Sequence, residues 1–150
     1  MPIKSFRGKL ATGSTETLSL HTNNGSIGYK IVKLEIIGQQ PGGFTQESTL
    51  QVYSVPTTPT SEIDFSDNTC LATAFWSSNT ASDQYADDMT VVFDNVIFNQ
   101  DIYLTHVGTS NSNINYHIEL EQIKLDLNEN TVATLKDIRN IASQWVNNIT

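Results

Sequence analysis

Hydrophobic and polar residues alternate along most of the first 125 positions, and this period of two is typical of β-strands. Turn residues separate the alternating segments, which are expected at 4–11, 16–21, 29–37, 48–55, 69–76, 89–93, 101–107 and 114–125. The pattern predicts an all-β fold: an antiparallel β-sandwich of about eight strands that resembles a jelly roll. The order of the strands within the sheets stays open.

The period changes near the end of the last expected strand. Tyr116, Ile118 and Leu120 share one face, whereas the next apolar set is Ile123, Leu125 and Leu127. A shift of one residue exchanges the two faces of a strand. We therefore predict a β-bulge near Gln122 that bends the chain out of the sheet.

The segment 128–150 follows a helical period and has no Gly or Pro. Asn128 is a suitable N-cap, and apolar residues then recur at steps of 3 and 4: Leu135, Ile138, Ala142, Trp145 and Ile149. We predict two parts, a β-sandwich domain over 1–127 and a C-terminal amphipathic α-helix over 128–150. Because so short a helix is marginal in water, its apolar seam must be covered. It packs either on its own sandwich or, as the alternative, in a trimeric bundle or a groove of a neighbouring subunit.

Charge is unevenly placed along the chain. The net charge is −8, and no Lys or Arg occurs from Leu34 to Ile123, a span that holds twelve acidic residues. A phosphate backbone requires several basic residues on one surface, so direct binding of nucleic acid is not expected. The acidic body either keeps the protein in solution or leaves the basic ends to meet a partner. In the latter case the first strand would contribute Lys4, Arg7 and Lys9 to an interface.

Cysteine content and hydropathy indicate where the chain is made. Cys70 is the only cysteine, which excludes an internal disulfide, and its apolar surroundings predict a small buried side chain. Assembly in a reducing cytosol fits this composition. The first residues do not resemble a signal peptide, and no segment approaches the 18 apolar residues of a membrane span.

Candidate chemistry is sparse. If 101–107 and 114–125 form a hairpin, His106 falls on the apolar side and His117 on the other, so the two histidines cannot share a metal. The acidic residues Asp83, Asp87 and Asp88 could supply oxygens to calcium, but the EF-hand spacing is absent. No motif for a nucleophile, phosphate loop, zinc site or dinucleotide appears. We therefore expect no catalytic site, cofactor or metal.

Three segments carry a family resemblance: "IKSFRGKLATGSTETLSLHTNNGSIGYKIVKLEI", "VIFNQDIYLTH" and "YHIELEQIKLDLNENTVATLKDIRN". They resemble small virion structural proteins of marine bacteriophages, of the kind that infect cyanobacteria and abundant ocean heterotrophs. The likeness spans most of the chain and weakens from 56 to 88. It implies a non-enzymatic particle component that is synthesised in a bacterial cytosol, and it leaves the position on the particle open.

Two functions are compatible with these observations. The first is a capsid decoration or minor capsid protein, a homo-oligomer that could be a trimer. It would bind the major capsid protein or other virion proteins through the helix seam and the basic first strand. The alternative is a receptor- or carbohydrate-binding module on a fibre or particle surface. That module would use Trp76 and the loop from Asp83 to Asp88, with or without calcium.

Overall fold

The computed structural model describes residues 2–20, 26–41, 43, 45–78 and 88–125, and these form eight strands and one 3-10 turn. The elements are β1 (Ile3–Ala11), β2 (Ser14–Leu18), β3 (Ile27–Gly38), β4 (Gln46–Tyr53), β5 (Cys70–Ser78), β6 (Asp88–Phe93), β7 (Ile102–Gly108), η1 (Thr109–Asn111) and β8 (Asn113–Lys124). The all-β prediction and its eight strands are confirmed, with strand ends displaced by a few residues. The predicted helix over 128–150 lies outside the described residues.

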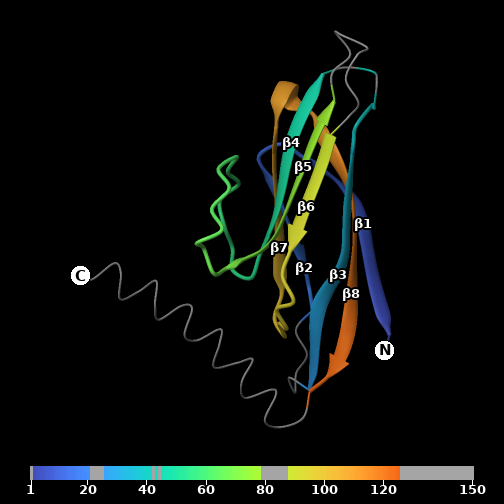
Figure 1. The fold of residues 1–150 in the computed structure, drawn as a ribbon, viewed down its shortest axis with the longest axis vertical. Coiled ribbons are helices and arrows are strands. Elements are labelled where there is room, and N and C mark those ends of the chain that lie inside the picture. The colour runs from blue at the N-terminus through green and yellow to red at the C-terminus, as the bar shows by residue number, and fades with distance from the viewer. Residues whose placement is uncertain (1, 21–25, 42, 44, 79–87, 126–150) are drawn as a thin grey trace, which may run out of the picture.

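The strands form two antiparallel sheets that pack face to face (Figure 1). The three-stranded sheet has the order β1-β8-β3, and the five-stranded sheet has the order β2-β7-β4-β5-β6. Across the sandwich, β1 lies over β2 and β7, while β3 lies over β5 and β6. β1 and β6 are therefore terminal strands at opposite edges of the molecule.

The hairpin considered above for 101–107 and 114–125 does not form between β7 and β8. β7 pairs with β2 and β4, whereas β8 pairs with β1 and β3 in the other sheet. Each is a central strand with both edges already hydrogen-bonded, so neither has an edge left for the other. The connection through η1 instead crosses from one sheet to the other, a distance of about 10 Å that a short segment can span.

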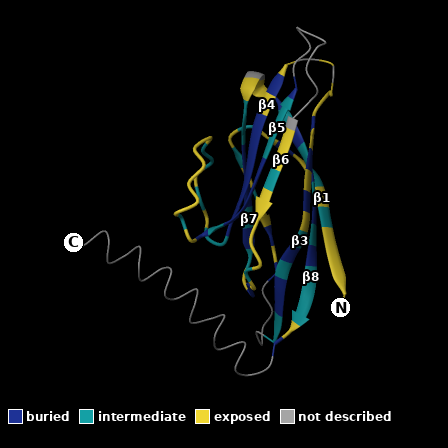
Figure 2. Cartoon of the chain, viewed as in Figure 1, coloured by how far each residue is buried: buried dark blue, intermediate teal, exposed yellow. Residues whose placement is uncertain are grey.

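The core lies between the inner faces of the two sheets (Figure 2). On β8, alternate residues point inward and are at most 3% exposed: Ile114, Tyr116, Ile118 and Leu120. They meet Leu50 and Val52 of β4 and Ile102 and Leu104 of β7 in one cluster. Each fully buried aliphatic side chain contributes roughly 1.5–3 kcal/mol, so this contact holds the two sheets together.

A β-bulge in β3 corrects two predictions. The register with β8 shifts between Ile31 and Lys33, which makes Val32 the extra residue. Ile31 and Leu34 are both buried and Val32 is half-buried, so the alternation expected over 29–37 is broken at Val32. The bulge predicted near Gln122 is not found, since β8 stays in register with β3 as far as Lys124. The bulge lies in the partner strand β3 instead, opposite Leu120 and Glu119.

Gly38, at the end of β3, allows the two sheets to approach closely. A Cβ atom at Gly38 would lie 2.5 Å from Nε1 of Trp76, which comes from β5 in the opposite sheet. Trp76 is partly buried and packs against the core. The indole ring therefore occupies the space that any side chain at position 38 would need.

Replacing Gly38 with Ala is expected to lower the free energy of unfolding by about 1–3 kcal/mol, because the new methyl group overpacks against the indole. Urea unfolding would measure the loss. In a Trp76→Phe background the same replacement should cost less, since the smaller ring leaves room. An equal cost in both backgrounds would show that the indole is not the obstacle.

Gly13 provides a matched control for that experiment. Its φ is +76°, and no atom lies within 4 Å of a Cβ built there. Gly13→Ala should cost about 1–2 kcal/mol from backbone strain alone, whichever residue occupies position 76.

Candidate interface on the three-stranded sheet

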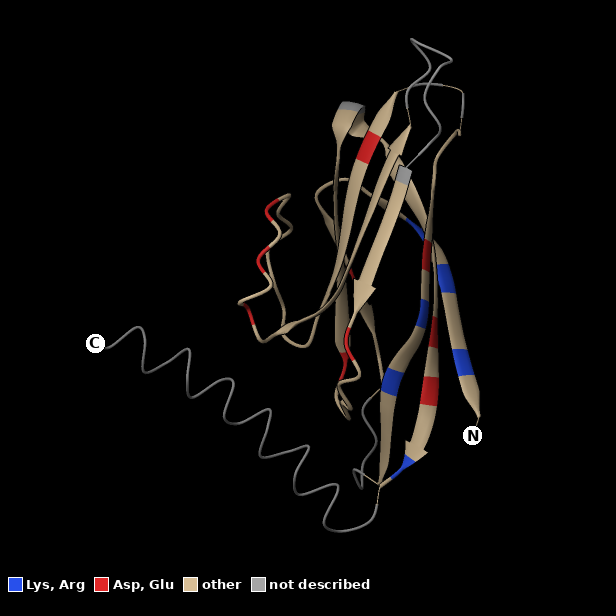
Figure 3. Cartoon of the chain, in the orientation of Figure 1, with Lys and Arg blue, Asp and Glu red and all other residues tan. Residues whose placement is uncertain are grey.

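The outer face of the three-stranded sheet carries most of the basic residues in the described part of the chain (Figure 3). Strand alternation points inner residues to the core and leaves charged residues outside. We call this surface the charged face. It is formed by Arg7 and Lys9 of β1, His117, Glu119 and Glu121 of β8, and Lys30, Lys33 and Glu35 of β3.

Register places these charges in rows across the three strands. His117 of β8 lies between Arg7 of β1 and Glu35 of β3. Nζ of Lys30 is 3.5 Å from a carboxylate oxygen of Glu121, its direct partner across the β3–β8 pair.

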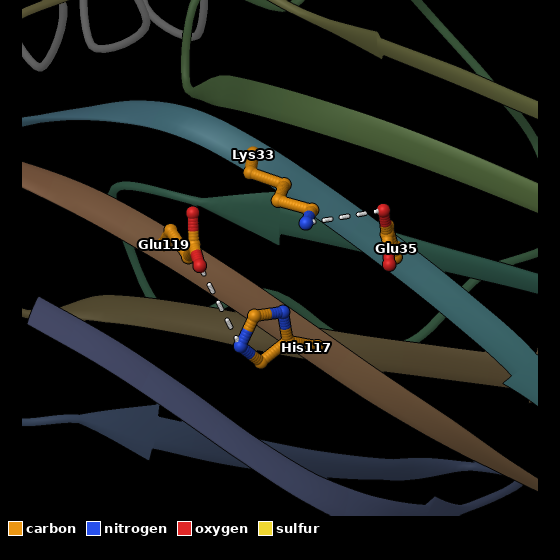
Figure 4. Close-up of polar contacts among 4 residues, drawn as sticks. All are labelled: Lys33, Glu35, His117 and Glu119. Atoms are coloured by element: carbon orange, nitrogen blue, oxygen red, sulfur yellow. Dashed lines mark ion pairs between the residues drawn. The ribbon is translucent and has the colours of Figure 1, made fainter.

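The remaining ion pairs run along single strands (Figure 4). Lys33 Nζ is 3.5 Å from Glu35 Oε1, and His117 Nε2 is 3.9 Å from Glu119 Oε1. Side chains in these pairs are 31% to 50% exposed, and surface pairs of this kind contribute only about 0–1 kcal/mol each. The charged face therefore adds little to the stability of the fold.

The three basic residues predicted on the first strand do not share one face. Arg7 and Lys9 belong to the charged face, whereas Lys4 has the inward parity of Phe6. Nζ of Lys4 lies 5.6 Å from the centroid of the Phe6 ring and 6.0 Å from that of Tyr29. All three side chains are nevertheless exposed, because β1 extends along the rim of the sandwich.

β1 is an open edge strand. It pairs with β8 on one side and ends the three-stranded sheet on the other. An edge strand presents unpaired backbone N–H and C=O groups, and basic side chains on it discourage uncontrolled pairing. The same arrangement favours a partner strand that brings acidic residues.

The two histidines among the described residues lie in different sheets. His106 is 0% exposed, and its Nδ1–H donates to the carbonyl oxygen of Leu10 at 2.9 Å. Its Nε2 atom is buried with no hydrogen-bond partner among the described residues. Burial lowers the pKa of His106, and its bonds to the backbone of Ala11 and Leu10 offset part of that effect. His117 belongs to the charged face on β8, whereas His106 is buried on β7.

Cys70 is not the fully buried side chain that its sequence context predicts. The register of β4 and β5 shifts between Val52 and Tyr53, and the bulge turns Leu71 inward in its place. Cys70 is half-buried, with Sγ 3.5 Å from Thr73 Oγ1 and 3.7 Å from Gln51 Oε1. Its thiol therefore has polar neighbours, Thr73 and Gln51, on one side.

Of the two features expected in a carbohydrate-binding module, the structure describes Trp76 but not the side chains of the loop from Asp83 to Asp88. The indole nitrogen of Trp76 is buried beside Gly38, and the ring packs on the core instead of standing free on a loop. Asp83 and Asp87 lie outside the described residues, and so does the side chain of Asp88. Sugar stacking on Trp76 therefore has no structural basis in this arrangement.

The described residues also bear on metal binding and membrane insertion. They contain no group of three or more His, Cys, Asp and Glu side chains placed to hold a metal ion. Among them, no helix is long and apolar enough to cross a membrane. The five residues of the predicted helix seam also lie outside the described residues: Leu135, Ile138, Ala142, Trp145 and Ile149.

Comparison with known proteins adds no relative. No protein-family model, curated protein or solved structure matches this chain. The resemblance to bacteriophage virion proteins therefore stays a prediction from the sequence.

His106 is expected to make the protein acid-sensitive. Its pKa in the folded state lies below the ordinary value of about 6.5, so the unfolded chain binds a proton there that the native imidazole does not. Stability should therefore fall as the pH drops below about 6.5. In His106→Gln, whose amide can still donate to Leu10, the loss of unfolding free energy between about pH 7.5 and about pH 5 should be smaller. Urea unfolding at both pH values measures it.

His117→Gln is the control for a histidine on the charged face. It should retain most of the acid sensitivity of the unmodified protein. If the two variants respond to acid alike, His106 does not cause the effect.

Proposed function

We propose that this chain is a non-enzymatic structural protein of a bacteriophage particle, a capsid decoration or minor capsid protein built on a jelly roll. The observation that carries the proposal is the nesting of its strand pairs. β1 pairs with β8, β2 with β7 and β4 with β5, as in one long hairpin whose tip lies between β4 and β5.

The remaining pair of such a hairpin would be β3 with β6. β6 itself pairs with β5, but the chain that follows it returns to β3. The N–H of Tyr29 donates to the carbonyl oxygen of Phe98 at 2.7 Å, and the N–H of Phe98 donates back at 2.9 Å. Three nested antiparallel pairs and one isolated bridge in the fourth position support the jelly-roll plan that viral capsid and lectin domains use.

Two features favour the capsid function over the lectin function. Trp76, the aromatic residue proposed to stack on sugars, is packed against Gly38 and the core. β1 is an open, exposed edge with basic side chains, which suits attachment to another protein subunit. The family resemblance of the sequence points the same way.

Partners follow from the charged face and the terminal segment. Carboxylates stand beside the basic residues on the charged face, so a phosphate backbone would meet repulsion as well as attraction. We infer protein partners: further copies of this chain, with a trimer as one option, and the major capsid protein or other virion proteins. The protein would be synthesised in the bacterial cytoplasm and function in the virion, without a cofactor.

Removing the basic charges of β1 should weaken attachment. Arg7→Gln combined with Lys9→Gln is expected to reduce binding to particles by about tenfold. Each exposed charge contact contributes at most about 1 kcal/mol, and the loss of two such contacts gives a change of about this size. Co-sedimentation of labelled protein with particles measures the loss, and immunogold labelling locates the bound protein.

The matched control removes two basic charges from the opposite edge of the same sheet. Lys30→Gln combined with Lys33→Gln changes the net charge equally and should leave binding nearly unchanged. If both pairs weaken binding to the same extent, only overall charge matters, and attachment through β1 is wrong.

The terminal seam gives a second test of the proposal. Changing Leu135, Ile138 and Trp145 to Gln should abolish oligomerisation or particle binding, because burial of the apolar seam against a partner would no longer stabilise the contact. Light scattering and co-sedimentation measure these two properties. A variant that changes Asn140 and Gln144 to Ala, both mostly off the seam, should behave like the original protein. A folded seam variant that still assembles normally would contradict the seam's role.

A further inference from the structure

A pocket of about 400 Å³ opens between the loop that follows β4 and the end of β6. The charged face does not include it, because it lies at the far edge of the five-stranded sheet. We call it the edge pocket. Its lining residues include Phe65, Asp67, Cys70, Val92, Phe93 and Asp94.

Three large apolar side chains are exposed at the edge pocket. Phe65 is 66% exposed, Val92 44% and Phe93 37%, and all three line the pocket. Phe65 and Phe93 come from separate segments and present two aromatic rings at one opening. Clustered exposed apolar side chains of this kind mark contact sites.

Negative charge accompanies the aromatic walls. Asp67 and Asp94 line the pocket, and neutralisation by Lys or Arg from the segments that build it is impossible, because none occurs from Leu34 to Ile123. Two neighbouring groups respond to this charge. Burial chiefly raises the pKa of Cys70, and Asp67 and Asp94 raise it further. The pKa of Tyr53 is raised to about 12 by burial and by Cys70, Asp67 and Asp64.

Aromatic rings and carboxylates together recognise organic cations. A Lys ammonium or an Arg guanidinium is attracted by the face of an aromatic ring and pairs with a carboxylate. The aliphatic part of either side chain would cover the apolar walls. The chemistry of the edge pocket therefore selects a basic side chain on a protein partner.

The chain's own basic strand cannot reach its own edge pocket. β1 lies over β2 and β7, and β6 is four strand spacings from β2, about 19 Å away. Figure 3 shows the basic residues of β1 and the acidic loop after β4 at opposite sides of the molecule. The two complementary surfaces can meet only between copies.

The basic residues of β1 and the edge pocket each lie at a terminal strand of a sheet. β1 ends one sheet, and β6, beside the pocket, ends the other. Met89 and Val92 of β6 are 45% and 44% exposed, so this edge is apolar and not protected by basic side chains. A second strand alongside β6 would cover it and bring its side chains to the pocket.

We propose that β1 of a second copy lies along β6 and places one of its basic side chains, Lys4, Arg7 or Lys9, in the edge pocket. This inference rests on the proposed function, in which β1 is an attachment element, and it names the partner as another copy of the chain. The contact is head-to-tail, so it builds a closed ring or an open filament.

Cys70 allows a direct test, because it is the only cysteine and lines the edge pocket. Lys4→Cys, Arg7→Cys and Lys9→Cys are made singly in the full chain and oxidised mildly. At least one should form disulfide-linked dimers and larger multimers with about tenfold higher yield than Lys33→Cys on β3, since docking raises the local thiol concentration. Adding Cys70→Ser should abolish those dimers, and Asp67→Asn with Asp94→Asn should reduce them strongly.

Three results would overturn the inference: yields no higher than that of Lys33→Cys, dimers that persist with Cys70→Ser, or dimers insensitive to the two Asn substitutions. None of them depends on particle attachment. If the charge variants of β1 lose particle binding but no link to Cys70 forms, the proposed function stands and the partner is wrong. If those variants bind particles normally, the proposed attachment through β1 fails instead.

Discussion

The burial of the two inner faces against each other is the interaction on which the rest of the structure depends. β8 and β3 bring one set of aliphatic residues and β4 and β7 another, and neither sheet could hide its set alone. Because this contact buries the inner face of each strand, only the outer faces, the terminal strands and the loops are accessible to a partner. The charged face, the β1 edge and the edge pocket lie in these positions.

The nested pairing explains why β1 and β6 are terminal strands of their sheets. A rolled hairpin of eight strands would close β3 with β6, but here β6 pairs with β5, and only Phe98 after it returns to Tyr29. β6 is thereby left as one terminal strand of the five-stranded sheet, and β1 is one terminal strand of the three-stranded sheet. One edge is basic and the other is apolar with acidic neighbours. This difference between the two edges favours a head-to-tail contact between copies, because the basic edge of one copy is complementary to the acidic surroundings of β6 in the next.

Much of the polar interior serves the fold and not chemistry. The side-chain amide of Gln51 is fully buried and donates to the carbonyl oxygens of Thr60 and Glu62, which ties the loop after β4 to the sheet. His106 holds β7 to β1 through Leu10. Such groups stabilise a fold only when they are bonded, because an unpaired buried polar group is costly. The tether of Gln51 also positions one wall of the edge pocket.

The sequence by itself determined the strands and most of their faces, because a period of two is a local property that each segment carries alone. Leu50 and Val52, or Ile118 and Leu120, could be assigned to the core in this way. Only the tertiary structure decided which strands pair, where Val32 and Leu71 break the period, and that β7 and β8 belong to different sheets. The edge pocket, too, could not be foreseen, since Phe65 and Phe93 are distant in the chain. Pairing and pockets depend on contacts between distant segments, and a local pattern contains no information about which distant segment will meet it.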